Sequence, residues 1–169
     1  MTEEKKIEIR PVVRSPASEY LSKTCRGIIT KIVAISPEFI PKYEHENDAC
    51  CDLIANIPEG EIVIGHGEIV KIDVGIKIQI PSGYEAKIRC RSGWATRGLM
   101  IANGEGTIDS NYRDPLKVIV TNITDKPLHI PHLAKIAQMA LKPVYYFSFE
   151  PVDTLDRSER DGGFGSTGF

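Results

Sequence analysis

The residues best suited to chemistry lie in five short stretches spread along the chain. In one of them, CRSGWATRG, a β-type segment ends on Arg91, Ser92 and Gly93. A guanidinium, a hydroxyl and a glycine that lets backbone approach closely suit phosphate oxygens. An ordinary turn with a surface arginine is the alternative.

A second stretch, NGEGTIDSNYRD, gathers Asn103, Asp109, Tyr112 and Arg113 around a glycine-bearing turn. An asparagine amide can pair with a donor and an acceptor on a planar heterocycle, and a carboxylate can take a proton from water. A tyrosine ring can pack against a sugar. A generic hairpin would not need all three groups.

Two further stretches, DACCDL and KIAQMA, each place one polar side chain in apolar sequence. Asp52 precedes Leu53 in an expected strand, and a buried carboxylate needs a partner, so a structural salt bridge and a binding role both stay open. Gln138 interrupts an apolar run, and its amide would be satisfied either by backbone or by a ligand.

The last stretch, GGFGSTG, lies close to the C-terminus. Its glycines let successive backbone N–H groups turn toward an anion, Ser166 and Thr167 add donors, and Phe164 offers a flat face to a base. It is not a Walker A loop, because G-K-[ST] is missing. A disordered glycine-rich end is the alternative.

Short strands must position these stretches. Residues 69–80, IVKIDVGIKIQI, alternate strictly and predict one half-buried strand. Turn residues at 81–83 and renewed alternation over 84–90 then predict a hairpin, with inward side chains at Tyr84, Ala86, Ile88 and Cys90. Further strands are predicted at residues 28–35, 61–65 and 116–121. By contrast, the apolar spacing within LAKIAQMALK fits a helix over residues 133–141.

Composition limits the class of protein. The chain has 169 residues, enough for one domain, and 21 Lys plus Arg against 23 Asp plus Glu, so it lacks the positive field of a nucleic-acid binder. No signal peptide or membrane-spanning stretch is evident, which predicts an intracellular protein that contacts no membrane. Polarity predicts an N-terminal extension over residues 1–27, a β domain over 28–150 and a C-terminal arm over 151–169.

Neither the cysteines nor the histidines have the spacing of a metal site. No C-x-x-C occurs, so the cysteines are expected to be reduced core residues, namely Cys25, Cys50, Cys51 and Cys90. His129 and His132 form an H-x-x-H, but Pro131 between them spoils a helical metal face. Two ordinary histidines are expected there.

In chain order, DACCDL, RSGWATRG, NGEGTIDSNYRD, KIAQM and RDGGFGSTG resemble the five motifs of the trimeric dUTP pyrophosphatases, the dUTPases. The resemblance runs from about Ile28 to the C-terminus. It implies an all-β, single-domain β-jelly roll with a flexible C-terminal arm, and a homotrimer whose subunits share active sites. It also implies that KIAQM is a strand, against the helical spacing.

The activity implied by the resemblance is Mg²⁺-assisted hydrolysis of dUTP to dUMP and pyrophosphate. Asp109 would activate the attacking water, and Asp52 would organise the metal and phosphate region indirectly, since Mg²⁺ is held mainly by the triphosphate. The substrate-binding residues would be Arg91, Ser92, Gly93, Asn103, Gly106, Thr107, Ile108, Tyr112, Gln138, Arg160, Phe164, Gly165, Ser166 and Thr167. Within this set the resemblance implies that Asn103 would lie at the uracil, Tyr112 under the deoxyribose and Gln138 at the α-phosphate. Arg157 is the alternative to Arg160 at the γ-phosphate.

The chain departs from the family pattern at Cys50, Asn111, Asp114 and residues 132–135. Two other functions remain as alternatives. The dCTP deaminases share the fold, but they lack a GGFGSTG arm. A non-catalytic trimer that binds nucleotide and regulates a protein partner would not need Asp109.

Overall fold

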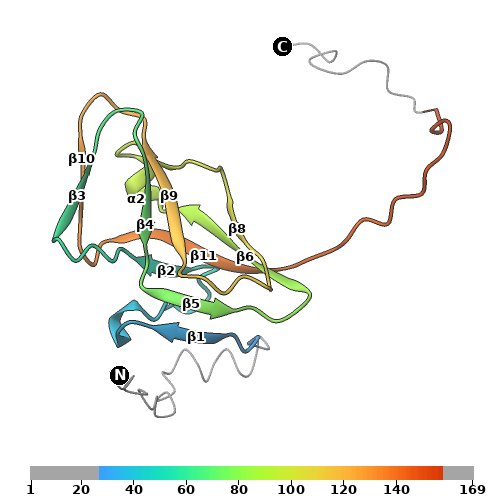
Figure 1. The fold of residues 1–169 in the computed structure, drawn as a ribbon, viewed down its shortest axis with the longest axis horizontal. Coiled ribbons are helices and arrows are strands. Elements are labelled where there is room, and N and C mark those ends of the chain that lie inside the picture. The colour runs from blue at the N-terminus through green and yellow to red at the C-terminus, as the bar shows by residue number, and fades with distance from the viewer. Residues whose placement is uncertain (1–26, 158–169) are drawn as a thin grey trace, which may run out of the picture.

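The computed structural model describes residues 27–157, and almost all of its regular structure is β-strand (Figure 1). Its elements are β1 (Lys31–Ala34), η1 (Pro37–Phe39), β2 (Cys51–Ile54), β3 (Glu61–Ile64), β4 (Ile69–Asp73), β5 (Ile76–Gln79), β6 (Tyr84–Cys90), α2 (Ser92–Ala95), β7 (Leu99–Ile101), β8 (Gly106–Ile108), β9 (Lys117–Asn122), β10 (Leu128–Pro131) and β11 (Lys135–Pro143). The all-β class predicted from the sequence is confirmed. No helix within residues 27–157 is long and apolar enough to cross a membrane.

The strands form small antiparallel sheets around one apolar core. The largest has the order β2-β11-β6-β8, a second has the order β4-β9-β7, and two pairs are formed by β1 with β5 and by β3 with β10. Most neighbours in a sheet are far apart in sequence, and the core draws side chains from every sheet. Because these contacts are non-local, the hydrophobic pattern alone could not give the strand order.

The segment predicted as one strand over residues 69–80 is two strands. The inward side chains are buried as expected, from Ile72 to Ile80, but β4 pairs with β9 whereas β5 pairs with β1. The chain turns at Gly75, where φ is +68°, and a Cβ there would lie 2.7 Å from Cδ1 of Phe39. Glycine therefore permits both the left-handed backbone and the close approach of the ring.

The hairpin predicted around residues 81–83 is also wrong. A turn does form, with the backbone N–H of Tyr84 donating to the carbonyl of Pro81 at 3.2 Å. It carries the chain between sheets, because β5 pairs with β1 and β6 pairs with β11 and β8. Of the four side chains predicted to point inward from this strand, Ala86 and Ile88 are buried, whereas Tyr84 and Cys90 are half-buried.

The KIAQM segment is a strand, as the family resemblance implies, and not a helix. β11 lies between β2 and β6 and pairs with both. A register shift between Lys135 and Ala137 marks a bulge, and the consecutive residues Ile136 and Ala137 are both buried. Because a bulge breaks the strict alternation of a strand, it produced the spacing that resembled a helix.

The turn after α2 is held against a buried amide. Asn122, fully buried, donates from Nδ2 to the carbonyl of Ile64 at 2.9 Å and accepts at Oδ1 from the backbone and hydroxyl of Thr124. Thr124 in turn packs against Gly98, whose φ is +92°. A Cβ at Gly98 would overlap with Cγ2 of Thr124. This packing fixes the backbone that leaves α2.

Replacing Gly98 with alanine should therefore destabilise the fold more than replacing Gly60, a second left-handed glycine with open space around its Cβ position. We expect Gly60→Ala to cost about 1–2 kcal/mol, the usual penalty of the left-handed backbone. Gly98→Ala should cost about 1–3 kcal/mol more because of overpacking against Thr124. Urea unfolding at one protein concentration measures both, and equal losses would contradict the packing argument.

Candidate active site

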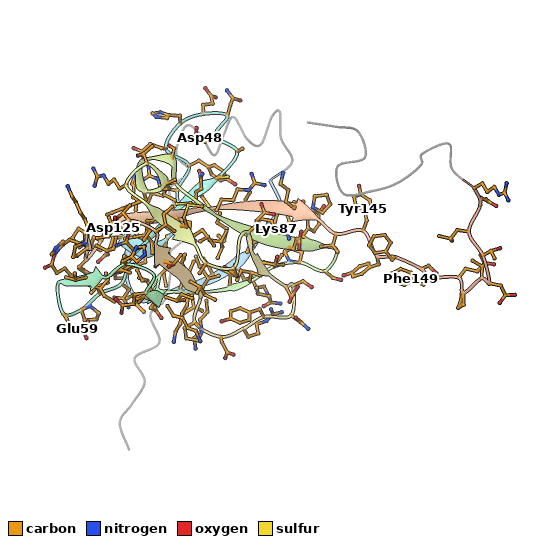
Figure 2. All side chains as sticks on the ribbon, turned by 90° about the horizontal axis from the view of Figure 1, so that it is seen from above. Asp48, Glu59, Lys87, Asp125, Tyr145 and Phe149 are labelled. Atoms are coloured by element: carbon orange, nitrogen blue, oxygen red, sulfur yellow. The ribbon has the colours of Figure 1, made fainter. Side chains whose placement is uncertain are left out.

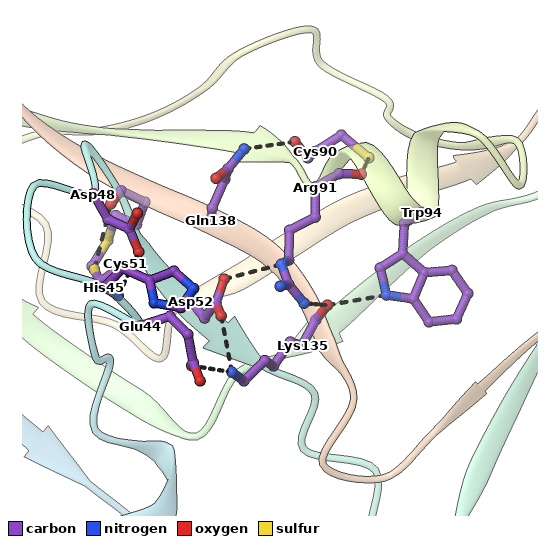
Figure 3. Close-up of polar contacts among 11 residues, drawn as sticks. Glu44, His45, Asp48, Cys51, Asp52, Cys90, Arg91, Trp94, Lys135 and Gln138 are labelled. Carbon is purple, nitrogen blue, oxygen red and sulfur yellow. Dashed lines mark hydrogen bonds and ion pairs between the residues drawn. The ribbon is translucent and has the colours of Figure 1, made fainter.

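A row of alternating charges connects β2, β11, the residue that follows β6 and a loop (Figure 3). Asp52 on β2 is 15% exposed and lies opposite Gln138 of β11. Its Oδ1 lies 3.0 Å from Nε of Arg91, and its Oδ2 lies 3.2 Å from Nζ of Lys135. A largely buried carboxylate is thus balanced by two cations. The structural salt bridge considered for Asp52 is present.

Glu44 ends this row of charges. It lies in the loop before β2, and its Oε2 lies 2.5 Å from Nζ of Lys135. The hydrogen bond from Lys135 lowers the pKa of Glu44, and the same bond, with a smaller contribution from Asp52, raises the pKa of Lys135. Lys135 therefore stays charged between two carboxylates and holds Asp52 toward Arg91.

Arg91 is fixed at a second point. The carbonyl oxygen of Lys135 accepts from Nη1 of Arg91 at 3.2 Å and from the indole Nε1 of Trp94 at 3.0 Å (Figure 3). Because Nε of Arg91 faces Asp52 and Nη1 donates to Lys135, the side chain is already fixed in one rotamer. Its remaining N–H groups can therefore bind an anion without a further loss of rotamer freedom. The arginine at the end of β6 is not an ordinary surface side chain.

Arg91 and Ser92 line a cavity of about 280 Å³ together with Asp52 and Gln138. Gln138 donates from Nε2 to the carbonyl of Cys90 at 3.1 Å, so the backbone partner considered in the sequence is present. That bond also orients the amide at this cavity. The structure therefore brings Asp52, Arg91, Ser92 and Gln138 together at one cavity.

The NGEGTIDSNYRD residues do not line this cavity. Asn103 and Gly104 lie in a loop between β7 and β8, and these strands pair with β9 and β6 rather than with each other. A Cβ at Gly106 would lie 3.3 Å from Cβ of Ile88 and 3.6 Å from Nδ2 of Asn103. Gly106 thus leaves room for the Asn103 amide, and Thr107 and Ile108 follow it in β8.

Asp109 begins a turn that presents Tyr112. Asp109 is exposed, and its carbonyl accepts from the backbone N–H of Tyr112 at 3.1 Å. The phenol of Tyr112 donates to the carbonyl of Pro115 at 2.9 Å, and partial burial raises its pKa. Arg113 donates to the carbonyls of Ser110 and Tyr112, so it stabilises the turn. Nothing among the described residues binds the Asp109 carboxylate through a hydrogen bond or ion pair.

The described cysteines are free. Cys51 is buried, as expected of a core residue, whereas Cys50 and Cys90 are only half-buried. Burial raises the pKa of Cys51 to about 11. His132 accepts at Nδ1 from the backbone N–H of Ile57, and His129 lies 3.5 Å from Glu61. Over residues 27–157 no group of three His, Cys, Asp or Glu side chains could hold a metal ion.

Sequence reasoning missed the roles of Glu44, Trp94 and Lys135. The Glu44–Lys135 contact joins residues 91 positions apart, and no local pattern marks it. Trp94 directly follows the RSG turn, which is the one signal that could have indicated it. The predicted arm residues Arg160, Phe164, Gly165, Ser166 and Thr167 lie outside the described residues.

Comparison with known proteins identifies the family. The family model described as dUTPase matches residues 37–168. The deoxyuridine 5'-triphosphate nucleotidohydrolase of Roseobacter denitrificans is 44% identical over 131 residues, covering 76% of this chain and 86% of the relative. The protein of the same name from Fusobacterium nucleatum is 41% identical and covers 85% of this chain and 99% of the relative.

Solved structures give the same fold. A Staphylococcus bacteriophage 80alpha dUTPase with dUpNHpp has a TM-score of 0.71 at 22% identity, covering 83% of this chain and 99% of the other. A dUTPase variant from phage phi11 of S. aureus, which coordinates a structural Mg(II) ion, has a TM-score of 0.64 at 20% identity, covering 75% and 98%. The predicted jelly roll is thereby confirmed. Because this family model spans most of its length and relatives of the same family are 41–44% identical to it, the chain belongs to the dUTPase family.

Proposed function

We propose that this protein hydrolyses dUTP to dUMP and pyrophosphate. The observation that carries the proposal is the fixed guanidinium of Arg91 in one cavity with Ser92 and Gln138. A guanidinium held from behind by Asp52 offers its free N–H groups to phosphate oxygens in the planar geometry that suits them. The amide of Gln138 would contact the α-phosphate. The choice of dUTP as the nucleotide rests on the relatives, which are named deoxyuridine 5'-triphosphate nucleotidohydrolases.

The donor set fits Mg²⁺ that arrives with the substrate. Magnesium takes oxygen ligands and is commonly held by one or two carboxylates together with substrate phosphates. Both oxygens of Asp52 face cations, so this carboxylate would act on the metal region indirectly, through Arg91. When bound, the ion would offset the negative charge of the triphosphate.

Asp109 is the proposed general base. Its exposed carboxylate is free of protein partners within residues 27–157 and can orient and deprotonate one water in line with the α-phosphorus. Tyr112 would pack under the deoxyribose. The hydrogen bond from its phenol to the carbonyl of Pro115 would hold the ring in place for this contact. Asn103 and the backbone of Gly106, Thr107 and Ile108 would read uracil.

The proposed assembly is a homotrimer with shared sites. Asp109 and Tyr112 line neither the cavity of Asp52 and Arg91 nor the cavity beside Trp94, which favours a site completed by a second copy. Residues 144–157 form no helix or strand and carry exposed aromatic rings, including Tyr145 and Phe149, on a segment that leaves the β domain (Figures 1 and 2). Such a run of exposed rings is typical of a surface that another protein covers. The arm of one subunit would close over the site of a neighbour.

The test is incubation of the purified protein with Mg²⁺ and, separately, dUTP, dCTP, dTTP and UTP, with pyrophosphate and ammonia followed together. We expect pyrophosphate from dUTP alone. Ammonia from dCTP would instead indicate a deaminase. Nucleotide binding without any product would indicate a regulatory protein.

A further inference from the structure

A second cavity, of about 390 Å³, adjoins the first and shares Arg91 and Ser92 with it. It is lined in addition by Gly93, Trp94, Arg97, Ala134 and Lys135. Its volume lies in the range of ligand-binding cavities. Three cationic side chains line it, and no carboxylate does. The charge of the lining favours an anion.

Arg97 is held at this cavity by Trp94. The guanidinium carbon of Arg97 lies 5.3 Å from the centre of the Trp94 ring, within the range of a cation–π contact. Trp94 is itself fixed by its bond to the carbonyl of Lys135, and the backbone N–H of Arg97 donates to the carbonyl of Trp94 at 3.0 Å. Gly98 then anchors the turn against Thr124. Arg97 is thus held in place although it is exposed.

Arg97 also supplies the uncompensated charge. The group has three cations, Arg91, Lys135 and Arg97. The carboxylates of Asp52 and Glu44 pair with Arg91 and Lys135, which leaves one positive charge without a partner. Within residues 27–157, Arg97 is the member of this group with no carboxylate in ion-pairing range. An anionic ligand would therefore meet a fixed guanidinium that no protein group neutralises.

We propose that this second cavity binds the terminal phosphates of the nucleotide and that Arg97 is a phosphate-binding residue that selects triphosphates over shorter phosphate chains. The inference rests on the proposed function and extends it. The α-phosphate would lie at Gln138 in the first cavity, and Arg91, which belongs to both cavities, would link the two ends of the chain. Arg97 is planar and always charged, so it can bind two phosphate oxygens at once.

The test uses Arg97→Gln and Arg97→Lys in the full chain, with Lys71→Gln as the control, because Lys71 is exposed on β4 and lines neither cavity. Calorimetry would measure affinities for inorganic tripolyphosphate, dUpNHpp and dUMP at fixed ionic strength. We expect Arg97→Gln to weaken binding of tripolyphosphate and dUpNHpp by about 10- to 100-fold, the usual worth of a hydrogen bond to a charged group. The affinity for dUMP should not change.

Arg97→Lys should bind tripolyphosphate with intermediate affinity, because lysine keeps the charge but loses the planar fork. An unchanged tripolyphosphate affinity in Arg97→Gln, or an equal loss for dUMP, would overturn the inference. Failure of the proposed function is a separate result: the wild-type protein would release no pyrophosphate from dUTP, whether or not tripolyphosphate binding depended on Arg97.

Discussion

Replacing Asp109 with asparagine is expected to lower kcat for dUTP by about 10²- to 10⁴-fold, the usual contribution of a general base. Asparagine has the same shape and keeps one oxygen, but it cannot accept the proton of the attacking water. The turn should survive, because the bond from the backbone of Tyr112 goes to the Asp109 carbonyl and not to its side chain. Affinity for dUpNHpp should therefore stay close to that of the wild type.

The matched control is Asp125→Asn, which removes another exposed carboxylate from a turn that lines neither cavity. It should keep wild-type kcat. Turnover measured under saturating dUTP, together with calorimetry of dUpNHpp, separates chemistry from binding. If Asp109→Asn retained wild-type turnover, another group would have to be the base.

Much of the fold could be predicted because a strand with one buried face shows a local alternation of apolar and polar residues. Alternation over residues 69–80 identified side chains that are in fact buried, from Ile72 to Ile80. It could not show that two strands share the pattern, because β4 and β5 face the same core while pairing with β9 and β1. Alternation records which face is buried and not which strand is the neighbour.

The candidate site could be recognised in the sequence only where its residues follow one another. Arg91 and Ser92 are adjacent, and Asp109 and Tyr112 share one turn, so their types were visible together. The contacts that fix Arg91 were not visible, since the carbonyl of Lys135 and the carboxylate of Asp52 reach it only through the pairing of β11 with β2 and β6. Arg91 is therefore a fixed donor only because strands far apart in the sequence pair with one another.

The proposed sharing of sites between subunits can be tested by mixing two inactive variants. One chain carries Asp109→Asn, and the other ends at Arg157 and so lacks the GGFGSTG arm. Each alone should have almost no activity, because each lacks one essential part at every site. In a mixed trimer, the arm of the first variant can close over a site whose intact Asp109 comes from the second.

Equal mixing should restore about one quarter of the wild-type activity, because half of the sites keep Asp109 and half of those receive an intact arm from a neighbour. The variants would be refolded together and the mixed trimers counted by native mass spectrometry. The control mixes Asp109→Asn with a chain that carries both changes, and no activity should return. Mixed trimers without recovered activity would contradict an arm donated to a neighbour, because an arm that served its own subunit could never complement. Recovery would also explain why residues 144–157 expose aromatic rings that the β domain of the same chain does not cover.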